Sequence, residues 1–582
     1  MTTIFNELIS LRSGQVASEL SSTVGLRSGV SIPAPALTSE AKELFTDDLL
    51  DLLAKLHREL NPLRVELLES RKVRQEAFDS GDLPGYLSAT EAGPARGEWR
   101  VAPLPRDLMR RRVEITGPVG DTKMVINMLS RSSTGDRADA AMLDFEDSQK
   151  PSWENVLAGF SNVIGAAKGT LEFVKPASGS APEKVYRLDP DDMPLLMVRV
   201  RGLHLDEVNV RVDDEPISGG LFELATCVYH TARTLLDQGK TPKFYIPKCE
   251  HYLEARWWNT LFERVQEALN IPSGTIKATF LVETLPAAFQ MEEILYEFRD
   301  HAAGLNGGRW DKIFSDIKVL KSHSDRVMAD RASISMNRSW MKNYVLQLIK
   351  VCHRHGAFGM GGMAAFTPGR TPELREAQTR KVLDDKQFEA SIGHDGCWVS
   401  HPYFIGPAMS AFKKENQLDV IPDIEEFPDL MPRSEGTCTL DGLRTNVRVG
   451  IAYMKGWNQD IGCVAWDDLM EDLATLEISR AQTWQWIANE IVLDCGTSVN
   501  RDLVKKIFEE ETFKIINERR VDMKGAVPAV VEAEITLIQK AAADASFIFM
   551  EEEFRQFLTC KSDLAGEDVD AKRAHLRHTA GC

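Results

Sequence analysis

Eight short runs of apolar and β-branched residues, separated by longer helical or irregular stretches, constrain the fold of this chain more than any other feature. The runs are Val113–Thr116, Ala140–Asp144, Leu195–Val200, Phe244–Ile246, Ile276–Val282, Ala302–Leu305, Ala357–Met360 and Cys397–Val399. Strands that alternate with crossover segments favour a parallel sheet. Because eight of them over roughly 290 residues suffice to close a barrel, we predict an α/β fold of the (β/α)8 TIM barrel class.

Helical patterns flank the predicted barrel on both sides. Leucines recur at helical spacing between Ser39 and Gly81, where we expect Pro62 to interrupt the helix. After Pro402 the chain is again largely helical, beyond a turn-rich linker near residues 422–436. We therefore predict a helical domain over residues 1–110, a barrel over 111–403 and a second helical domain over 404–582.

Composition narrows the range of partners. The chain has 582 residues, with 69 Lys and Arg against 87 Asp and Glu, a formal net charge of −18 that disfavours nucleic acids and acidic membrane surfaces. No apolar stretch approaches the roughly 18 residues of a membrane-spanning helix. The nine cysteines are scattered without a Cys-x-x-Cys pair, which favours free thiols, a reducing compartment and a cytoplasmic location.

Polar residues that end the predicted strands are candidates for chemistry, because reacting groups of barrel enzymes lie at the carboxyl ends of the strands. They are Asp144, Glu146, Asp147, Arg199, Arg201, His204, Lys248, Glu283, Asp311 and His401. Glu283 and Asp311 would offer hard oxygen ligands from adjacent strands, as Mg²⁺ prefers. The alternative is that each carboxylate caps a helix or pairs with an arginine.

Two further residues stand out by their position in the pattern. Arg199 ends an apolar run, where it suits recognition of a carboxylate or stabilisation of an enolate, or else pairs with a structural acid. Asp472 falls on the apolar face of a helical run predicted over Asp467–Ile487. A carboxylate there must be paired, protonated or functional. Burial would raise its pKa and suit a base that removes a C–H proton, whereas Arg480 is an alternative partner.

Several of these stretches together resemble malate synthases, in particular the shorter A-type enzymes, from about Asn61 to about residue 560. Among them are Asp144-Phe-Glu-Asp-Ser148, Arg199-Val-Arg-Gly-Leu-His-Leu205, Gly304-Leu-Asn-Gly-Gly-Arg-Trp-Asp311, His394-Asp-Gly396 and Met470-Glu-Asp472. The resemblance implies an N-terminal helical clasp and a C-terminal helical domain over the mouth of the barrel. It also implies the Claisen condensation of acetyl-CoA with glyoxylate, followed by hydrolysis to malate and CoA in the glyoxylate cycle.

The resemblance also implies roles for individual residues. Asp472 would take the methyl proton of acetyl-CoA, and Arg199 would stabilise the enolate oxygen. Glu283 and Asp311 would hold Mg²⁺. Glyoxylate would contact the backbone of Gly308, Arg309, Trp310 and Asp311, and Pro402 would lie near the CoA adenine.

Two alternatives remain open on the sequence alone. A Mg²⁺-dependent malyl-CoA lyase-like or aldolase barrel would share the metal and the arginine, so Asp472 and the domain that carries it discriminate between the reactions. A barrel reused as a non-catalytic binding protein is the second alternative, and the intact set of Arg199, Glu283, Asp311 and Asp472 disfavours it. The C-terminal Ala580-Gly-Cys582 is unlike the Ser-Lys-Leu peroxisomal signal, which also favours the cytoplasm.

Overall fold

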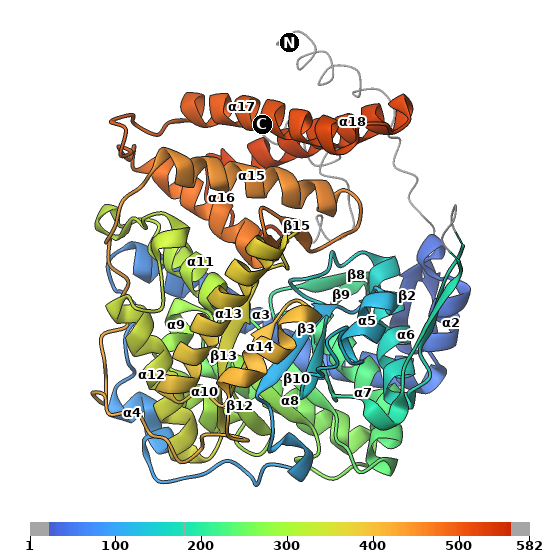
Figure 1. Ribbon diagram of the computed structural model, residues 1–582. Helices are drawn as coiled ribbons and strands as arrows, with labels where there is room; N and C mark the ends of the chain where they lie inside the picture. The colour runs from blue at the N-terminus through green and yellow to red at the C-terminus, as the bar shows by residue number, and fades with distance from the viewer. Residues whose placement is uncertain (1–22, 178–181, 560–582) are drawn as a thin grey trace.

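A closed barrel of eight parallel strands forms the centre of the molecule (Figure 1). The computed structural model describes residues 23–177 and 182–559. The strands follow one another around the barrel in chain order, and β14 closes it by pairing with β3. They are β3 (Val113–Pro118), β4 (Ala140–Asp144), β7 (Leu195–Arg199), β10 (Lys243–Ile246), β11 (Lys277–Leu281), β12 (Ala302–Asn306), β13 (Phe358–Ala364) and β14 (Gly396–Val399). Each of the eight predicted runs is one of these strands, so the predicted fold class is confirmed.

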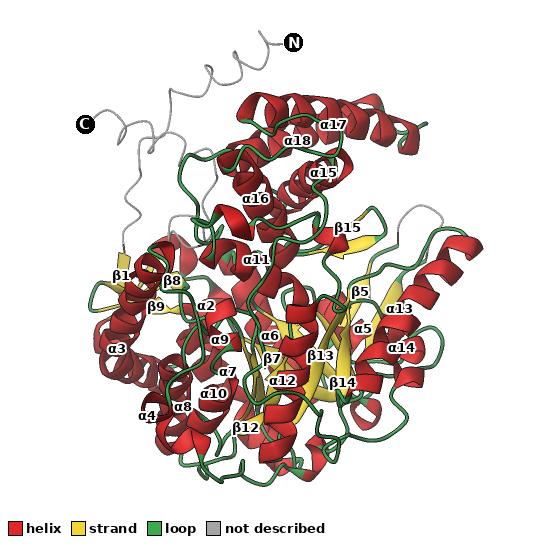
Figure 2. Ribbon diagram, turned by 90° about the vertical axis from the view of Figure 1, so that its left-hand side faces the viewer, coloured by secondary structure: helices red, strands yellow, loops and turns green. Residues whose placement is uncertain are grey.

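Helices surround the strands and bury their outer faces (Figure 2). Inside the barrel a second apolar cluster, which includes Met142, Met197 and Phe358, fills the lumen, so the barrel is packed and its open space lies at one end. The covering helices are α5 (Thr122–Met128), α6 (Trp153–Lys168), α7 (Gly219–Asp237), α8 (Tyr252–Ala268), α9 (Leu285–Ala288), α10 (Met291–Glu297), α11 (Arg309–Val319), α12 (Ser339–His355), α13 (Pro372–Ile392) and α14 (Ile405–Ala411).

The N-terminal segment packs against the outside of the barrel helices. Its helices are α2 (Ser39–Leu44), α3 (Asp47–Asp79) and the short α4 (Ala89–Ala92). A four-stranded sheet joins β1 (Thr23–Gly25) and β2 (Val30–Pro33) to β8 (Asp206–Val212) and β9 (Glu215–Ser218), and a separate hairpin is formed by β5 (Glu172–Lys175) and β6 (Lys184–Arg187). The sheet ties this segment to the loop that follows β7.

The expected break at Pro62 is wrong, because α3 runs through it. A proline inside a helix costs about 3 kcal/mol. The leucines of the preceding turns, including Leu49, Leu53, Leu56 and Leu60, are buried to within a few per cent, and each buried leucine contributes about 1.5–3 kcal/mol. Packing of that face therefore outweighs the local cost, and Pro62 itself faces solvent.

The C-terminal helices lie over one end of the barrel (Figure 1). After α14 a segment without helix or strand runs over residues 412–439, which is longer than the predicted linker. The elements that follow are α15 (Leu440–Trp457), β15 (Val464–Trp466), β16 (Leu469–Glu471), α16 (Leu473–Ala488), α17 (Arg501–Asp522) and α18 (Pro528–Phe549). They share an apolar core of their own, and α16 also packs on barrel helix α11.

The described residues bear on two expectations from composition, one on membrane-spanning helices and one on the cysteines. Across residues 23–177 and 182–559, no helix has the length and apolar character needed to cross a membrane. The seven cysteines in those ranges are free thiols, as predicted. Cys560 and Cys582 lie outside the described residues.

Candidate active site

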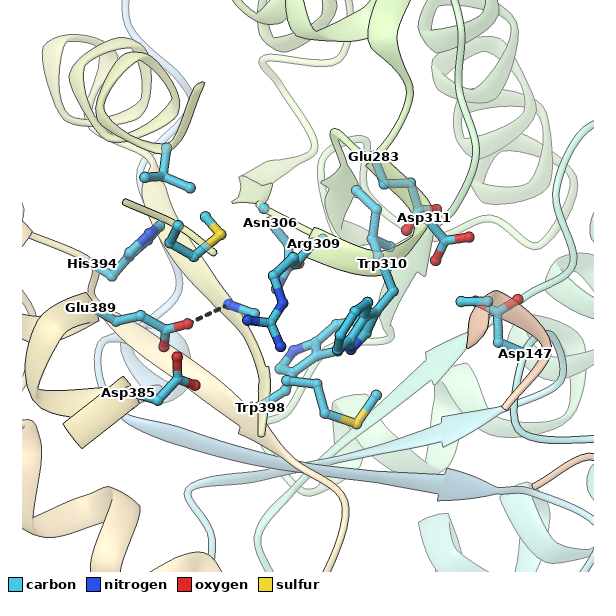
Figure 3. Close-up of a pocket in the computed structure, with 18 of the residues that line it drawn as sticks. Asp147, Glu283, Asn306, Arg309, Trp310, Asp311, Asp385, Glu389, His394 and Trp398 are labelled. Carbon is cyan, nitrogen blue, oxygen red and sulfur yellow. Dashed lines mark hydrogen bonds between the residues drawn. The ribbon is translucent and has the colours of Figure 1, made fainter. Parts of the chain in front are cut away.

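A pocket opens at the carboxyl ends of the barrel strands, beneath the C-terminal helices (Figure 3). Together with the open space at its entrance, it encloses about 720 Å³. Four of the side chains singled out from the sequence line it together: Arg199, Glu283, Asp311 and Asp472. The first three come from the barrel and the fourth from the segment over its mouth.

Arg199 is the last residue of β7 and is 2% exposed. Its Nε and Nη2 donate to the two carboxylate oxygens of Asp144 at 2.7 and 2.6 Å, and its Nη1 donates to Asp147 at 3.1 Å. Burial alone would lower the pKa of Arg199, but the neighbouring carboxylates raise it well above its ordinary value. The arginine is thus paired with acids, as one of the two sequence interpretations expected, and the pairing fixes a permanent cation in the pocket wall. Its role toward an enolate stays a prediction.

Lys248, just after β10, lies among the acids of the rim. Its Nζ is 2.8 Å from Glu146, 2.9 Å from Asp147 and 3.2 Å from Asp311. Its backbone N–H donates to Oε1 of Glu283 at 2.8 Å. The backbone of Lys248 has a φ of 54°, a left-handed conformation that costs a non-glycine residue about 1–2 kcal/mol. This conformation places one residue against both the acidic cluster and Glu283.

Glu283 and Asp311 offer oxygens suited to a divalent cation. Glu283 Oε2 is buried and accepts no hydrogen bond, and the buried Asp311 Oδ1 is paired with the Lys248 ammonium at 3.2 Å. Burial raises the pKa of both carboxyls, that of Asp311 well above its ordinary value. Buried carboxylate oxygens without donors are costly unless a cation compensates them. Within the described residues no group of three or more His, Cys, Asp or Glu side chains could hold a metal ion. Mg²⁺ commonly takes one or two carboxylates and completes its coordination with water and substrate oxygens, and the carboxylates of Glu283 and Asp311 fit that pattern.

Asp472 is the N-cap of α16 rather than a residue within a helix, so the predicted helical run over Asp467–Ile487 is wrong at its start. Its carboxylate accepts from the backbone N–H of Thr475 at 3.2 Å, and its own N–H donates to the Thr475 hydroxyl at 3.0 Å. This capping box satisfies helix-end donors and ends the preceding strand. The inference of burial is correct, because Asp472 is 8% exposed. Arg480 pairs with Glu477 instead.

Burial raises the pKa of Asp472 to about 7, with a further contribution from the charge of Asp147, while Arg199 acts in the opposite direction. A carboxylate of this pKa is a much stronger base than an ordinary aspartate and is still substantially ionised near neutral pH. The group can therefore accept a proton from a weak acid in the pocket.

Backbone hydrogen bonds fix this carboxylate over the barrel. The N–H of Met470 donates to the carbonyl of Ala365 at 2.7 Å, and the N–H of Leu473 donates to the carbonyl of Asp147 at 3.1 Å. The hairpin β15–β16 thus extends the end of barrel strand β13 and also touches the loop after β4. The sequence analysis missed this hairpin, although the turn residues Asp467 and Asp468, with φ of 44° and 65°, are of a type that favours such turns.

The segment between β12 and α11 forms another wall of the pocket. Gly308 is the N-cap of α11, so the first backbone amides of the helix are free to bind an anion. A Cβ on Gly308 would lie 3.2 Å from Glu283 Oε2, which explains the glycine. Arg309 stacks on Trp310, with 4.2 Å from its Cζ to the ring centre, and both side chains line the pocket (Figure 3).

Some predicted residues lie elsewhere. Pro402 begins a short 3₁₀ helix after β14 and is not among the residues that line this pocket. Arg201 turns away to pair with Glu207 and Glu223. Conversely, Asp385 and Glu389 from helix α13 line the pocket, and the sequence analysis missed them because a helix position carries no strand-end signal.

Comparisons with known proteins agree with this architecture. Three family models match the chain: "Malate synthase, N-terminal domain" over residues 29–92, "Malate synthase, TIM barrel domain" over 195–426 and "Malate synthase, C-terminal" over 437–562. Malate synthase A of Escherichia coli is 41% identical over 488 residues, covering 82% of this chain and 89% of the relative. Malate synthase of Myxococcus xanthus is 44% identical over 491 residues, covering 83% and 88%.

More distant similarity extends to solved structures. A magnesium/glyoxylate complex of Haloferax volcanii malate synthase aligns with a TM-score of 0.40 and 12% identity, covering 76% of this chain and 99% of that one. A pyruvate/acetyl-CoA ternary complex of the same enzyme gives 0.42 and 12%, covering 75% and 98%.

Proposed function

The chain belongs to the malate synthase family, and from this membership we propose which of its residues carry the condensation of acetyl-CoA with glyoxylate. The observation that supports the proposal is the shared pocket, in which Asp472 meets Arg199, Glu283 and Asp311. Malate synthase activity requires a base, a cation beside the enolate oxygen and a group that makes the aldehyde electrophilic. We assign the first role to Asp472, the second to Arg199 and the third to the Mg²⁺ that Glu283 and Asp311 would hold.

Glu283 and Asp311 would hold Mg²⁺, which when bound supplies the Lewis-acid charge that makes the aldehyde carbon of glyoxylate electrophilic. The amides at the start of α11, from Gly308 to Asp311, would bind and orient glyoxylate. Glyoxylate bound there would lie against the pocket wall that Trp310 also lines.

Asp472 would remove a proton from the methyl group of acetyl-CoA. The electron pair of the C–H bond becomes the enolate, whose oxygen the fixed guanidinium of Arg199 would stabilise. The enolate carbon then forms the new C–C bond with the aldehyde carbon, the π electrons of the C=O bond move to the aldehyde oxygen, and this oxygen takes up a proton from solvent to become the hydroxyl of malyl-CoA. Hydrolysis of the thioester releases malate and CoA. Because Asp472 and Arg199 are buried, their charges would act on the enolate with little screening by water.

Product analysis tests the reaction. Protein mixed with glyoxylate, acetyl-CoA and Mg²⁺ should release free CoA and malate in equal amounts, and EDTA should abolish the release. Accumulation of malyl-CoA without hydrolysis would instead indicate a lyase.

A metal titration tests the proposed ligands. Glu283→Gln should require a higher Mg²⁺ concentration for half-maximal activity and should bind Mg²⁺ more weakly by calorimetry. Glu293→Gln is the matched control, because Glu293 is also buried but pairs with Arg96 at 2.8 Å outside the pocket. An unchanged Mg²⁺ titration in Glu283→Gln would contradict the assignment.

A further inference from the structure

Arg331 connects the two halves of the pocket. It begins a 3₁₀ turn in the loop between α11 and α12 and is 6% exposed. Its Nη2 donates to Oε1 of Glu471 at 3.0 Å, and its Nη1 donates to the carbonyl of Thr475 and to the hydroxyl of Ser479, both at 3.2 Å. Its hydrogen-bond acceptors on the C-terminal segment therefore all lie close to Asp472 in the chain, from Glu471 just before it to Ser479 seven residues after it.

The same guanidinium also touches the barrel wall of the pocket. Its Cζ lies 5.7 Å from the ring centre of Trp310, within the range of a cation–π contact. Trp310 immediately precedes Asp311 and lines the pocket. One buried cation therefore contacts both the segment that ends in a proposed metal ligand and the cap that holds the proposed base.

Other contacts dock α16 on the barrel without Arg331. Farther along the helix, Gln482 donates to the carbonyl of Ala329 and Trp486 to that of Met328 at 2.9 Å. Near the start of α16, the backbone N–H groups of Met470 and Leu473 hold the segment to the barrel, but the side chain of Glu471 has Arg331 as its partner: Glu471 is 2% exposed, its Oε1 accepts from Arg331, and its Oε2 accepts no hydrogen bond. Loss of Arg331 would therefore leave the helix docked by its backbone and remove the side-chain contacts that orient the residues around Asp472.

We propose that Arg331 is a positioning residue, which sets the direction of the Asp472 carboxylate relative to the substrate wall at Trp310 and Asp311. This inference rests on the proposed role of Asp472 as the base. A displacement of about 1 Å in a reacting group can cost about 100-fold in rate, so the expected effect is on proton removal and not on glyoxylate binding.

The test compares Arg331→Met, Arg331→Lys and the control Arg64→Met. Arg64 is a matched buried arginine, 3% exposed, that bonds Asp206 and the carbonyls of Leu203 and Leu205 between α3 and the barrel. We expect Arg331→Met to lower kcat by about 100-fold with little change in KM for glyoxylate. The primary isotope effect with methyl-deuterated acetyl-CoA should rise, because proton removal becomes slower, and Arg331→Lys should restore part of the rate.

Arg64→Met should lower the melting temperature but leave kcat and the isotope effect of the folded enzyme unchanged. Glu471→Gln keeps the size of the side chain that Arg331 contacts but removes its charge. It should therefore lower kcat in the same way as Arg331→Met but by less, and it serves as the test if Arg331→Met folds poorly. Wild-type kcat and isotope effect in Arg331→Met, or in Glu471→Gln if the first variant does not fold, would overturn the inference.

Asp472→Asn separates the two levels of the argument. If Asp472→Asn still turns over, the proposed base is wrong. If Asp472→Asn is inactive while Arg331→Met behaves as the wild type, only the role of Arg331 is refuted.

Discussion

Two clusters of buried charge lie at different levels of the barrel, one around Arg111 just before β3 and one at the mouth, with Trp398 reaching both, and they differ in how fully their polar atoms are satisfied. In the first cluster, Arg111 donates to Glu114 at 2.7 Å, to Tyr245 at 2.8 Å and to Thr279 at 3.0 Å, and Trp398 donates to the second oxygen of Glu114 at 3.0 Å. At the mouth, Oε2 of Glu283 accepts no hydrogen bond, and Oδ1 of Asp311 has the Lys248 ammonium at 3.2 Å. The polar atoms around Arg111 are therefore satisfied by one another, whereas Glu283 keeps an acceptor for a ligand.

The largest expected difference comes from one substitution made in both clusters. Arg199→Lys at the mouth should lower kcat by about 10²- to 10³-fold, because an ammonium cannot reproduce the fork that holds Asp144 and also faces an enolate. Arg111→Lys in the other cluster should leave kcat near the wild-type value and lower the free energy of unfolding by about 1–3 kcal/mol. Steady-state kinetics and urea unfolding measure the two effects. Similar kcat losses in both variants would contradict the distinction.

Removal of the Arg111 cation should affect stability most. Arg111→Met leaves the fully buried Glu114 without its counter-charge, which typically costs about 3–5 kcal/mol. Chemical denaturation would measure the loss. Exposed Arg58→Met, which removes an ion pair with Asp213 at 2.7 Å at the surface, is the control and should change stability by less than about 1 kcal/mol. Equal losses would show that burial is not the cause.

The pH dependence of activity tests the electrostatics of the mouth. Burial raises the pKa of Asp472 to about 7 in the metal-free protein, and bound Mg²⁺ would lower it, so the ascending limb of kcat/KM at saturating Mg²⁺ should have its midpoint well above pH 4 and no higher than about pH 7. Below that point activity should fall roughly tenfold per pH unit, as the base becomes protonated. An ascending limb near pH 4, the range of an unperturbed aspartate, would contradict the raised pKa.

The smallest expected effect is on metal-free stability. A carboxyl whose folded pKa is raised from 3.8 to about 7 binds a proton in the folded state that the unfolded chain has released. Its stabilising contribution is therefore complete below pH 4 and is lost as the pH rises toward 7. The melting temperature in EDTA should fall less over this window in Asp472→Asn than in the wild type. Asp189→Asn, at an exposed helix cap, should retain the wild-type dependence.

The barrel could be predicted from the sequence because its strands are fully buried apolar runs. β4, for example, is buried at every position from Ala140 to Asp144, which gives a continuous apolar signal. The strands of the N-terminal sheet and of the β15–β16 hairpin are short and partly exposed, so they lack this signal. Their pairing depends on contacts between segments far apart in the chain.

The site could be predicted in part for the same reason. Glu283 and Arg199 follow or end buried strands, so topology alone brings them to the mouth. The position of Asp472 was predicted from helical periodicity, which gave its burial correctly but missed the capping box with Thr475. Lys248 was recognised only as a rim residue, because its placement among four carboxylates depends on a left-handed backbone conformation that no residue pattern encodes. Arg331 contacts Trp310 and the start of α16 from a loop, and the sequence pattern gave no signal for it.

The most direct test of the central claim, that an acid from the C-terminal segment completes a site built by the barrel, is turnover of Asp472→Asn together with its Mg²⁺-dependent glyoxylate binding. Asp189→Asn provides the matched control, with kinetics and binding expected to equal those of the wild type. The account predicts that Asp472→Asn binds glyoxylate as the wild type does in calorimetry, while malate and CoA release falls by about 10²- to 10⁴-fold. Turnover close to the wild-type rate in that variant would contradict it.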